Sequence, residues 1–217
     1  MEWGILLFVL LGLLLGFLVL QATFASRHWD RVIAEGDREA LAEAIDDALD
    51  GWRDARPPKG TPPADSQALQ SVTLVGADNR RCRVSLLAGA DIYVADNRRQ
   101  EAGTPVDVGR RAAVTMAERL LYEVPHVRFD EVQVDIYGAA EGGSGTNGAG
   151  MQRCLLTTRV TRDLAYESQW DEAEPHEILA SWRTRQADDG TIDPNDGALI
   201  VPAESRRAAG SNPGGAS

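Results

Sequence analysis

The sequence is poor in the residues that build covalent frameworks and metal centres. It contains only two cysteines, Cys82 and Cys154, and three histidines in 217 residues. The cysteines lie far apart and outside any CxxC-type motif, so they form no disulfide framework and no locally paired set of zinc ligands. We therefore expect neither a bound metal nor a cofactor.

Recognisable catalytic and nucleotide-binding motifs are also missing. No GxSxG or cysteine-nucleophile signature is present. The glycine-rich stretch at 138–150 has no lysine and precedes a strand pattern, whereas a phosphate-binding loop precedes a helix, so we expect no nucleotide ligand. One enzymatic alternative stays open, a small membrane-tethered hydrolase that uses His126 or His176 with nearby acidic residues.

Positive charge is scarce, and lysine almost absent. Lys59 is the only lysine, and 22 basic residues face 33 acidic ones, which gives a net charge of −11. Such a surface repels phosphate backbones, so the composition argues against a nucleic-acid partner.

The most informative segment is an uncharged run at residues 3–26, flanked by Trp3 and Trp29. About 20 apolar residues in a helix span the roughly 30 Å hydrocarbon core of a bilayer, and indole rings favour its interfaces. We expect a single transmembrane helix at 3–26 and hence a protein of the cell membrane.

The alternative for this segment is a cleaved signal peptide, for which Thr23 and Ala25 would make a poor cleavage site. Signal peptides begin with basic residues and have a shorter apolar core, whereas this chain begins Met-Glu. An uncleaved anchor is therefore favoured. Arg27, Arg31 and Arg38 follow the span and no basic residue precedes it, which predicts a cytoplasmic location for the rest of the chain.

Gly12 and Gly16 lie one helical turn apart within this span. A GxxxG pair lets a second helix approach closely, so these glycines are candidates for transmembrane packing, although glycine is common in membrane spans.

An amphipathic stalk helix is predicted at 27–55. Its apolar stripe includes Leu41, Ile45, Leu49 and Trp52, and acidic residues occupy the opposite face. A stripe of this kind has to be buried. It can pack on the soluble domain of the same chain, on a second copy or on another protein, so these four residues are candidates for protein interaction or self-association.

Prolines at 57–63 predict a semi-rigid linker over 56–68, before a soluble domain at 69–201 and a disordered tail at 202–217. Strand patterns at 72–77 and 82–88 flank a turn and predict a hairpin, and 91–95 is an ambiguous third strand. Thr104, Pro105 and Asp107 predict the capped start of a helix, which Pro125 ends. Strands at 129–137 and 151–161 and a helix at 175–185 complete the order ββ(β)αββα. This order predicts an α+β fold in which helices cover one face of a sheet, a two-layer α/β sandwich.

The anchor, the stalk and the missing catalytic motifs together suggest a non-catalytic protein. We expect a membrane-anchored subunit that binds another protein or stabilises a membrane assembly.

Overall fold

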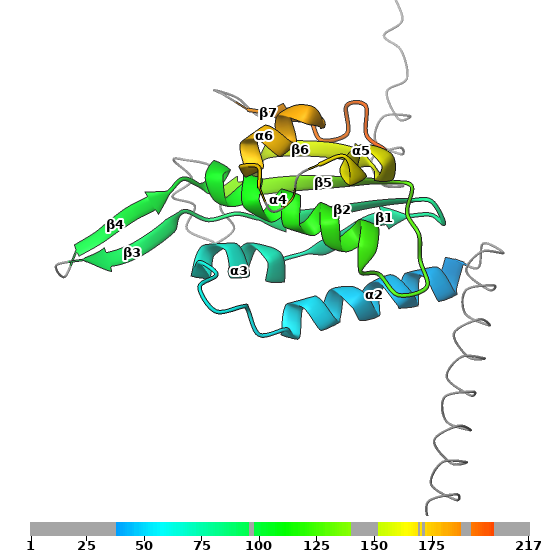
Figure 1. Ribbon diagram of the computed structural model, residues 1–217, viewed down its shortest axis with the longest axis horizontal. Helices are drawn as coiled ribbons and strands as arrows, with labels where there is room; N and C mark the ends of the chain where they lie inside the picture. The colour runs from blue at the N-terminus through cyan, green and yellow to red at the C-terminus, as the bar shows by residue number, and fades with distance from the viewer. Residues whose placement is uncertain are drawn as a thin grey trace, which may run out of the picture.

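Figure 1 shows the computed structural model of the chain. It describes residues 38–95, 98–139, 152–168, 170, 172–187 and 192–201. The helices are α2 (Arg38–Asp54), α3 (Pro63–Gln70), α4 (Pro105–Tyr122), α5 (Arg162–Tyr166) and α6 (Pro175–Ser181). The strands are β1 (Thr73–Ala77), β2 (Arg81–Leu87), β3 (Asp91–Ala95), β4 (Arg98–Gly103), β5 (Glu131–Ala139), β6 (Gln152–Thr161) and β7 (Arg183–Gln186).

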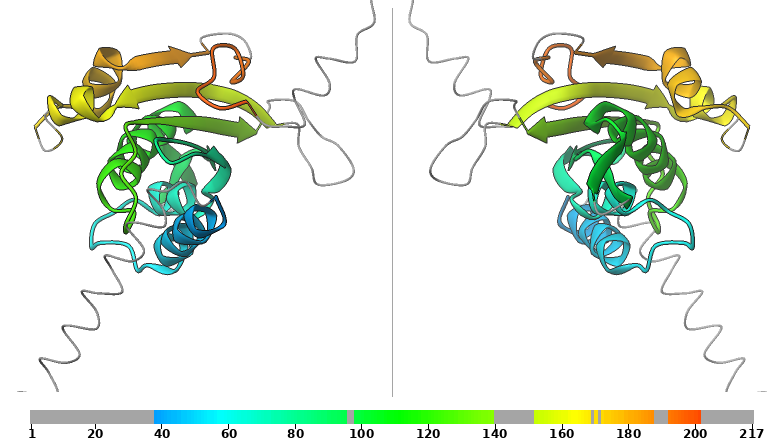
Figure 2. Two further views of the ribbon diagram at one scale, coloured as in Figure 1. Left: turned by 90° about the vertical axis from the view of Figure 1, so that its right-hand side faces the viewer. Right: turned by 90° about the vertical axis from the view of Figure 1, so that its left-hand side faces the viewer.

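Five of the strands form one mixed sheet in the order β1-β2-β5-β6-β7. All neighbours are antiparallel except β2 and β5, which run parallel with Val84 opposite Val134. A parallel pair needs a crossover, and α4 lies in the connection between these two strands. Figure 2 shows α2 and α4 on the same side of the long strands β5 and β6. The described fold is thus a mixed sheet with helices, which agrees with the predicted α+β class.

Two local predictions from the sequence are confirmed, the hairpin and the capped start of the helix after Thr104. β1 and β2 form the predicted hairpin. At the start of α4, the Thr104 hydroxyl accepts from the Asp107 amide at 3.2 Å, and the Asp107 carboxylate accepts from the Thr104 amide at 3.1 Å. This reciprocal capping box satisfies two backbone donors that the first helical turn leaves free.

Several elements differ from those expected. The extended linker predicted at 56–68 is shorter, because Pro63 begins α3, and proline is well accommodated in the first turn of a helix. The helix predicted to reach Arg185 ends at Ser181, since Trp182 adopts an extended conformation. Residues 183–186 then pair with β6 as the edge strand β7. The strand β4 and the short helix α5 were not predicted.

The apolar stripe of α2 is buried against the chain's own domain. Leu41, Ile45 and Leu49 belong to the same hydrophobic core as α4 and the sheet, and the half-buried Trp52 packs against it. Of the three possible burial sites for this stripe, the structure therefore uses the domain of the same chain. Leu41, Ile45 and Leu49 are therefore not free to bind a partner in this fold, whereas Trp52 keeps part of its surface exposed.

Polar contacts also fasten the N-terminal helices to the domain. Arg53 of α2 donates through Nε and Nη2 to the Val72 carbonyl at 3.2 and 2.6 Å. Arg111 of α4 makes a two-pronged contact with Asp65 of α3, at 2.8 and 2.7 Å. Two parallel hydrogen bonds between a guanidinium and a carboxylate fix the geometry as well as the charge, so α3 is held in one orientation on α4.

No helix among the described residues is long and apolar enough to span a membrane. The predicted span at 3–26, with Gly12 and Gly16, lies outside the described residues, as does the predicted tail at 202–217.

The burial of the α2 stripe predicts a stability effect. Ile45 is fully buried, so Ile45→Ala should lower the free energy of unfolding by about 3 kcal/mol through lost packing and a residual cavity. Urea unfolding of the full chain in mild detergent, followed by circular dichroism, measures this change.

The matched control is Asp46→Ala on the exposed face of α2, which should change stability by less than about 0.5 kcal/mol. Unchanged stability of Ile45→Ala together with lost self-association would contradict this packing, because the stripe would then serve a second copy.

Candidate functional site

The sheet face opposite α4 is lined with polar side chains. Along β5, Val132, Val134 and Ile136 lie in the core with α4, so the alternating residues Gln133 and Asp135 point to the other face. Strand pairing brings Arg83 of β2 to this face as well, because it lies opposite Gln133. These side chains form a polar, charged surface on the face of the sheet that α4 does not cover.

A buried ion pair lies at the centre of this face. Arg83 Nε donates to Asp135 Oδ2 at 2.7 Å, and the two side chains are 2% and 0% exposed. Removing two charges from water is costly, and the pair is tolerated only when further hydrogen bonds satisfy the remaining atoms.

Asp135 has these additional partners. Its Oδ1 accepts from Gln133 Nε2 at 2.8 Å and from Thr157 Oγ1 at 2.6 Å. Both carboxylate oxygens are therefore hydrogen-bonded by side chains from three adjacent strands, which makes a connected polar network.

The remaining donors of the network bind a C-terminal segment, residues 192–201, which we call the strap. Arg83 Nη1 donates to Asn195 Oδ1 at 3.0 Å and to the Ile200 carbonyl at 2.7 Å, and Nη2 donates to the Pro194 carbonyl at 3.0 Å. The Leu199 amide donates to Gln133 Oε1 at 2.7 Å. The strap thus covers the polar face and satisfies donors that would otherwise be buried without partners.

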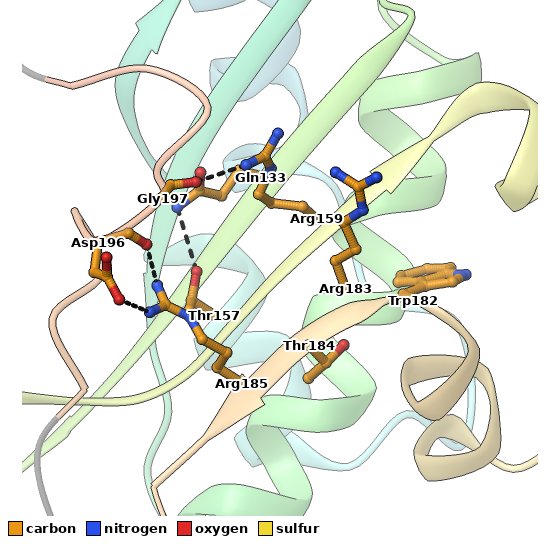
Figure 3. Close-up of a pocket in the computed structure, with 9 residues that line it drawn as sticks. All are labelled: Gln133, Thr157, Arg159, Trp182, Arg183, Thr184, Arg185, Asp196 and Gly197. Atoms are coloured by element: carbon orange, nitrogen blue, oxygen red, sulfur yellow. Dashed lines mark hydrogen bonds and ion pairs between the residues drawn. The ribbon is translucent and has the colours of Figure 1, made fainter.

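Beside the strap lies a cavity of about 360 Å³, shown in Figure 3 and called here the basic pocket. Three arginines contribute to its lining, Arg159 from β6 and Arg183 and Arg185 from β7. The rest of its lining consists of Gln133, Thr157, Trp182, Thr184, Asp196 and Gly197.

Two of these arginines already have carboxylate partners. Arg159 Nη2 lies 2.8 Å from Glu131 Oε1, and its Nη1 donates to the Gly197 carbonyl at 2.6 Å. Arg185 Nη1 lies 2.8 Å from Asp196 Oδ2. The Arg183 side chain has no hydrogen-bond or ion-pair partner within the described parts of the chain.

A second cavity lies at the carboxyl ends of the parallel strands β2 and β5. It measures about 460 Å³ and is lined by residues that include Ser71, Leu87 and Tyr137. Burial, and then the nearby Asp135 carboxylate, raise the pKa of the Tyr137 phenol to about 12. This phenol remains protonated at neutral pH and is not activated as a base.

The candidate catalytic histidines lie elsewhere. Neither His126 nor His176 lines either of these two cavities. His126 occupies a left-handed backbone conformation, φ 62°, in the turn after α4, and His176 lies exposed in the first turn of α6. Within the described residues, neither of these two cavities therefore supports the hydrolase alternative. Nor do three or more His, Cys, Asp or Glu side chains gather there in an arrangement that could hold a metal ion.

The two cysteines are free and buried. Cys82 lies on β2 and Cys154 on β6, with β5 between them. Two strand spacings are about 10 Å, and a disulfide requires Cα atoms within roughly 7 Å, so this sheet order excludes a bridge between them.

Sequence reasoning did not identify Arg83, Gln133 or Asp135 as a cluster. A signal was present, because charged or amide residues alternate with apolar residues in both strands. What the sequence did not reveal was the parallel pairing that places the two strands side by side.

Comparison with known proteins gives no match. No protein-family model, no curated protein and no solved structure shows significant similarity to this chain.

The buried network predicts a large effect for one substitution. Asp135→Ala leaves Arg83 buried without its counter-charge and should destabilise the domain by roughly 3–5 kcal/mol, measured by urea unfolding. The double variant Arg83→Met with Asp135→Leu should regain only part of this loss. It removes both charges, but it leaves Gln133, Thr157 and the strap carbonyls without their partners. A loss below about 1 kcal/mol in the single variant would contradict a buried, water-excluded pair.

A further prediction concerns the thiols. Burial is the main cause that raises the pKa of both cysteines, that of Cys154 to about 11. At pH 8 both therefore stay protonated and shielded, and a maleimide should label neither in the native protein and both in urea. Rapid native labelling, or an intact mass 2 Da low because of a disulfide, would contradict the described sheet.

Proposed function

We propose that this chain is a membrane-anchored, non-catalytic subunit whose domain binds another protein and helps to assemble or stabilise a membrane complex. The observation that carries this proposal is a two-stranded ribbon, β3 with β4, which projects from the body of the domain (Figure 1).

The ribbon has few interactions that would stabilise it on its own. Among the described strands, β3 and β4 pair only with each other and do not join the five-stranded sheet. A two-stranded hairpin is marginally stable in water, and its outer edges present backbone donors and acceptors that another strand can pair with. Ile92 on β3 is also 55% exposed. A protein that adds a strand to the ribbon and covers Ile92 would satisfy both features.

The anchor supports the same proposal. The uncharged segment 3–26, and the arginines that follow it in the sequence, favour a single-pass protein of the cell membrane with its domain in the cytoplasm. Gly12 and Gly16 would then be available for packing with a partner's transmembrane helix. Because the α2 stripe is occupied by the chain's own core, we place protein binding on the ribbon and not on the stalk helix.

The proposal predicts the effect of a substitution on the ribbon. Ile92→Asp should lower recovery of the cross-linked partner roughly tenfold, since a charge would be buried at the contact while the fold is unaffected. Cross-linking in the native membrane, extraction in mild detergent and affinity recovery of the full chain measure this loss.

The matched control is Tyr166→Asp. Tyr166 is 83% exposed on α5, which lies away from the ribbon (Figure 1), so recovery should be unchanged. Recovery of the unsubstituted chain only as a bare monomer would overturn the proposal, as would equal losses for both variants.

A further inference from the structure

The register of β6 and β7 places two arginines directly opposite each other. Arg159 and Arg183 are Cα partners in this antiparallel pair, and both line the basic pocket. Directly opposed residues have Cβ atoms about 5 Å apart, and like charges in such a pair are destabilising. An anion beside the two guanidinium groups would reduce this repulsion, although Arg159 is already paired with Glu131 and Arg183 is exposed to solvent.

The charges around the pocket leave one positive charge without compensation. Arg159 is balanced by Glu131 and Arg185 by Asp196. The Arg183 guanidinium has no acidic partner within the described parts of the chain. The pocket thus offers the unused donors of Arg183 and a net local charge of about one.

The space available exceeds that of a bare ion. At about 360 Å³ the pocket lies near the lower end of the range of small-molecule sites, roughly 300–1,000 Å³. Trp182 supplies an apolar part of its wall, and its Nε1 is already engaged with Ser168 Oγ at 3.0 Å. A ligand can therefore place an apolar group beside the indole ring while its charged end meets the arginines.

We propose that the basic pocket binds a monocarboxylate that carries an apolar group, with the carboxylate held by the guanidinium of Arg183. A planar guanidinium matches a carboxylate with two parallel hydrogen bonds. A single negative charge balances the one uncompensated arginine, whereas a phosphate monoester brings about −1.5 to −2. The carboxylate can come from a free organic acid or from an acidic side chain of a protein. This site is separate from the β3–β4 ribbon and does not depend on the function proposed for it.

The test uses the full chain in uncharged detergent micelles at pH 7, observed by the arginine Nε–H resonances in nuclear magnetic resonance spectra. Phenylacetate should shift the Arg159 and Arg183 resonances with a Kd on the order of 1 mM. Phenylacetamide, its uncharged counterpart, should cause no shift. A capped peptide with one glutamate distinguishes the two sources, since tighter binding than phenylacetate indicates a protein side chain and weaker binding a small acid.

The decisive variant is Arg183→Gln, which should weaken phenylacetate binding roughly tenfold because a charge-assisted contact is lost. Arg183→Lys keeps the positive charge but loses the planar guanidinium, which can make two parallel hydrogen bonds. Phenylacetate binding to this variant should therefore weaken by an intermediate amount. Arg128→Gln is the matched control, since Arg128 is an exposed arginine outside the pocket.

Three results would overturn the proposal. These are no shift with either carboxylate at about ten times the expected Kd, tighter binding of inorganic phosphate than of both carboxylates, and equal losses for Arg183→Gln and Arg128→Gln. The thermal unfolding midpoint of each variant verifies that the domain stays folded.

Discussion

The buried ion pair between Arg83 and Asp135 determines how the second face of the sheet is covered. One face packs on α4 through valine, isoleucine and leucine side chains, as a two-layer fold requires. The other face carries charges that cannot remain buried without partners. Arg83 has five N–H donors, and Asp135 uses only one of them, so the guanidinium requires further acceptors. The strap at 192–201 provides them through the Pro194 and Ile200 carbonyls and the Asn195 side chain. A segment without helix or strand is thereby held on the sheet by defined hydrogen bonds.

The position of the strap also explains the positive charge of the basic pocket. The strap carries Asp196 and Gly197 to the edge of the sheet, where they engage Arg185 and Arg159. Arg183 lies opposite Arg159 and two residues before Arg185 on β7, and it gains no such partner in the described structure. The same constraint that satisfies the centre of the polar face leaves one positive charge at its margin. In a chain with a net charge of −11, this local positive charge supports the carboxylate site that we propose for the basic pocket.

Local features of the fold could be predicted from the sequence, and long-range ones could not. The capping box of α4 depends on residues three positions apart, and the β1–β2 hairpin on a turn between two strand patterns, so both could be read directly. The parallel pairing of β2 with β5 depends on contacts about fifty residues apart, and no local pattern encodes it. Residues 183–185 were predicted to be helical because Trp182 continues an apolar helical spacing. Pairing with β6 instead makes them a strand, a case in which tertiary contacts override local preference.

For the candidate site, too, the local features could be predicted from the sequence and the long-range ones could not. The individual arginines and acids are visible in the sequence, but their grouping depends on sheet order and on the strap's return across the sheet. The stripe of α2 was correctly expected to be buried, and only the structure identifies the chain's own core as its partner. The membrane segment at 3–26, in contrast, is inferred from the sequence alone, because it lies outside the described residues.

The central claim is that the buried network makes the strap part of the cooperative fold. Hydrogen exchange of single backbone amides tests it most directly, because the Leu199 amide donates to Gln133 while the Val134 amide lies in the central strand β5. We predict that Leu199 and Val134 exchange with similar free energies, close to that of global unfolding. A Leu199 amide that exchanges almost without protection, while Val134 remains protected, would contradict the claim.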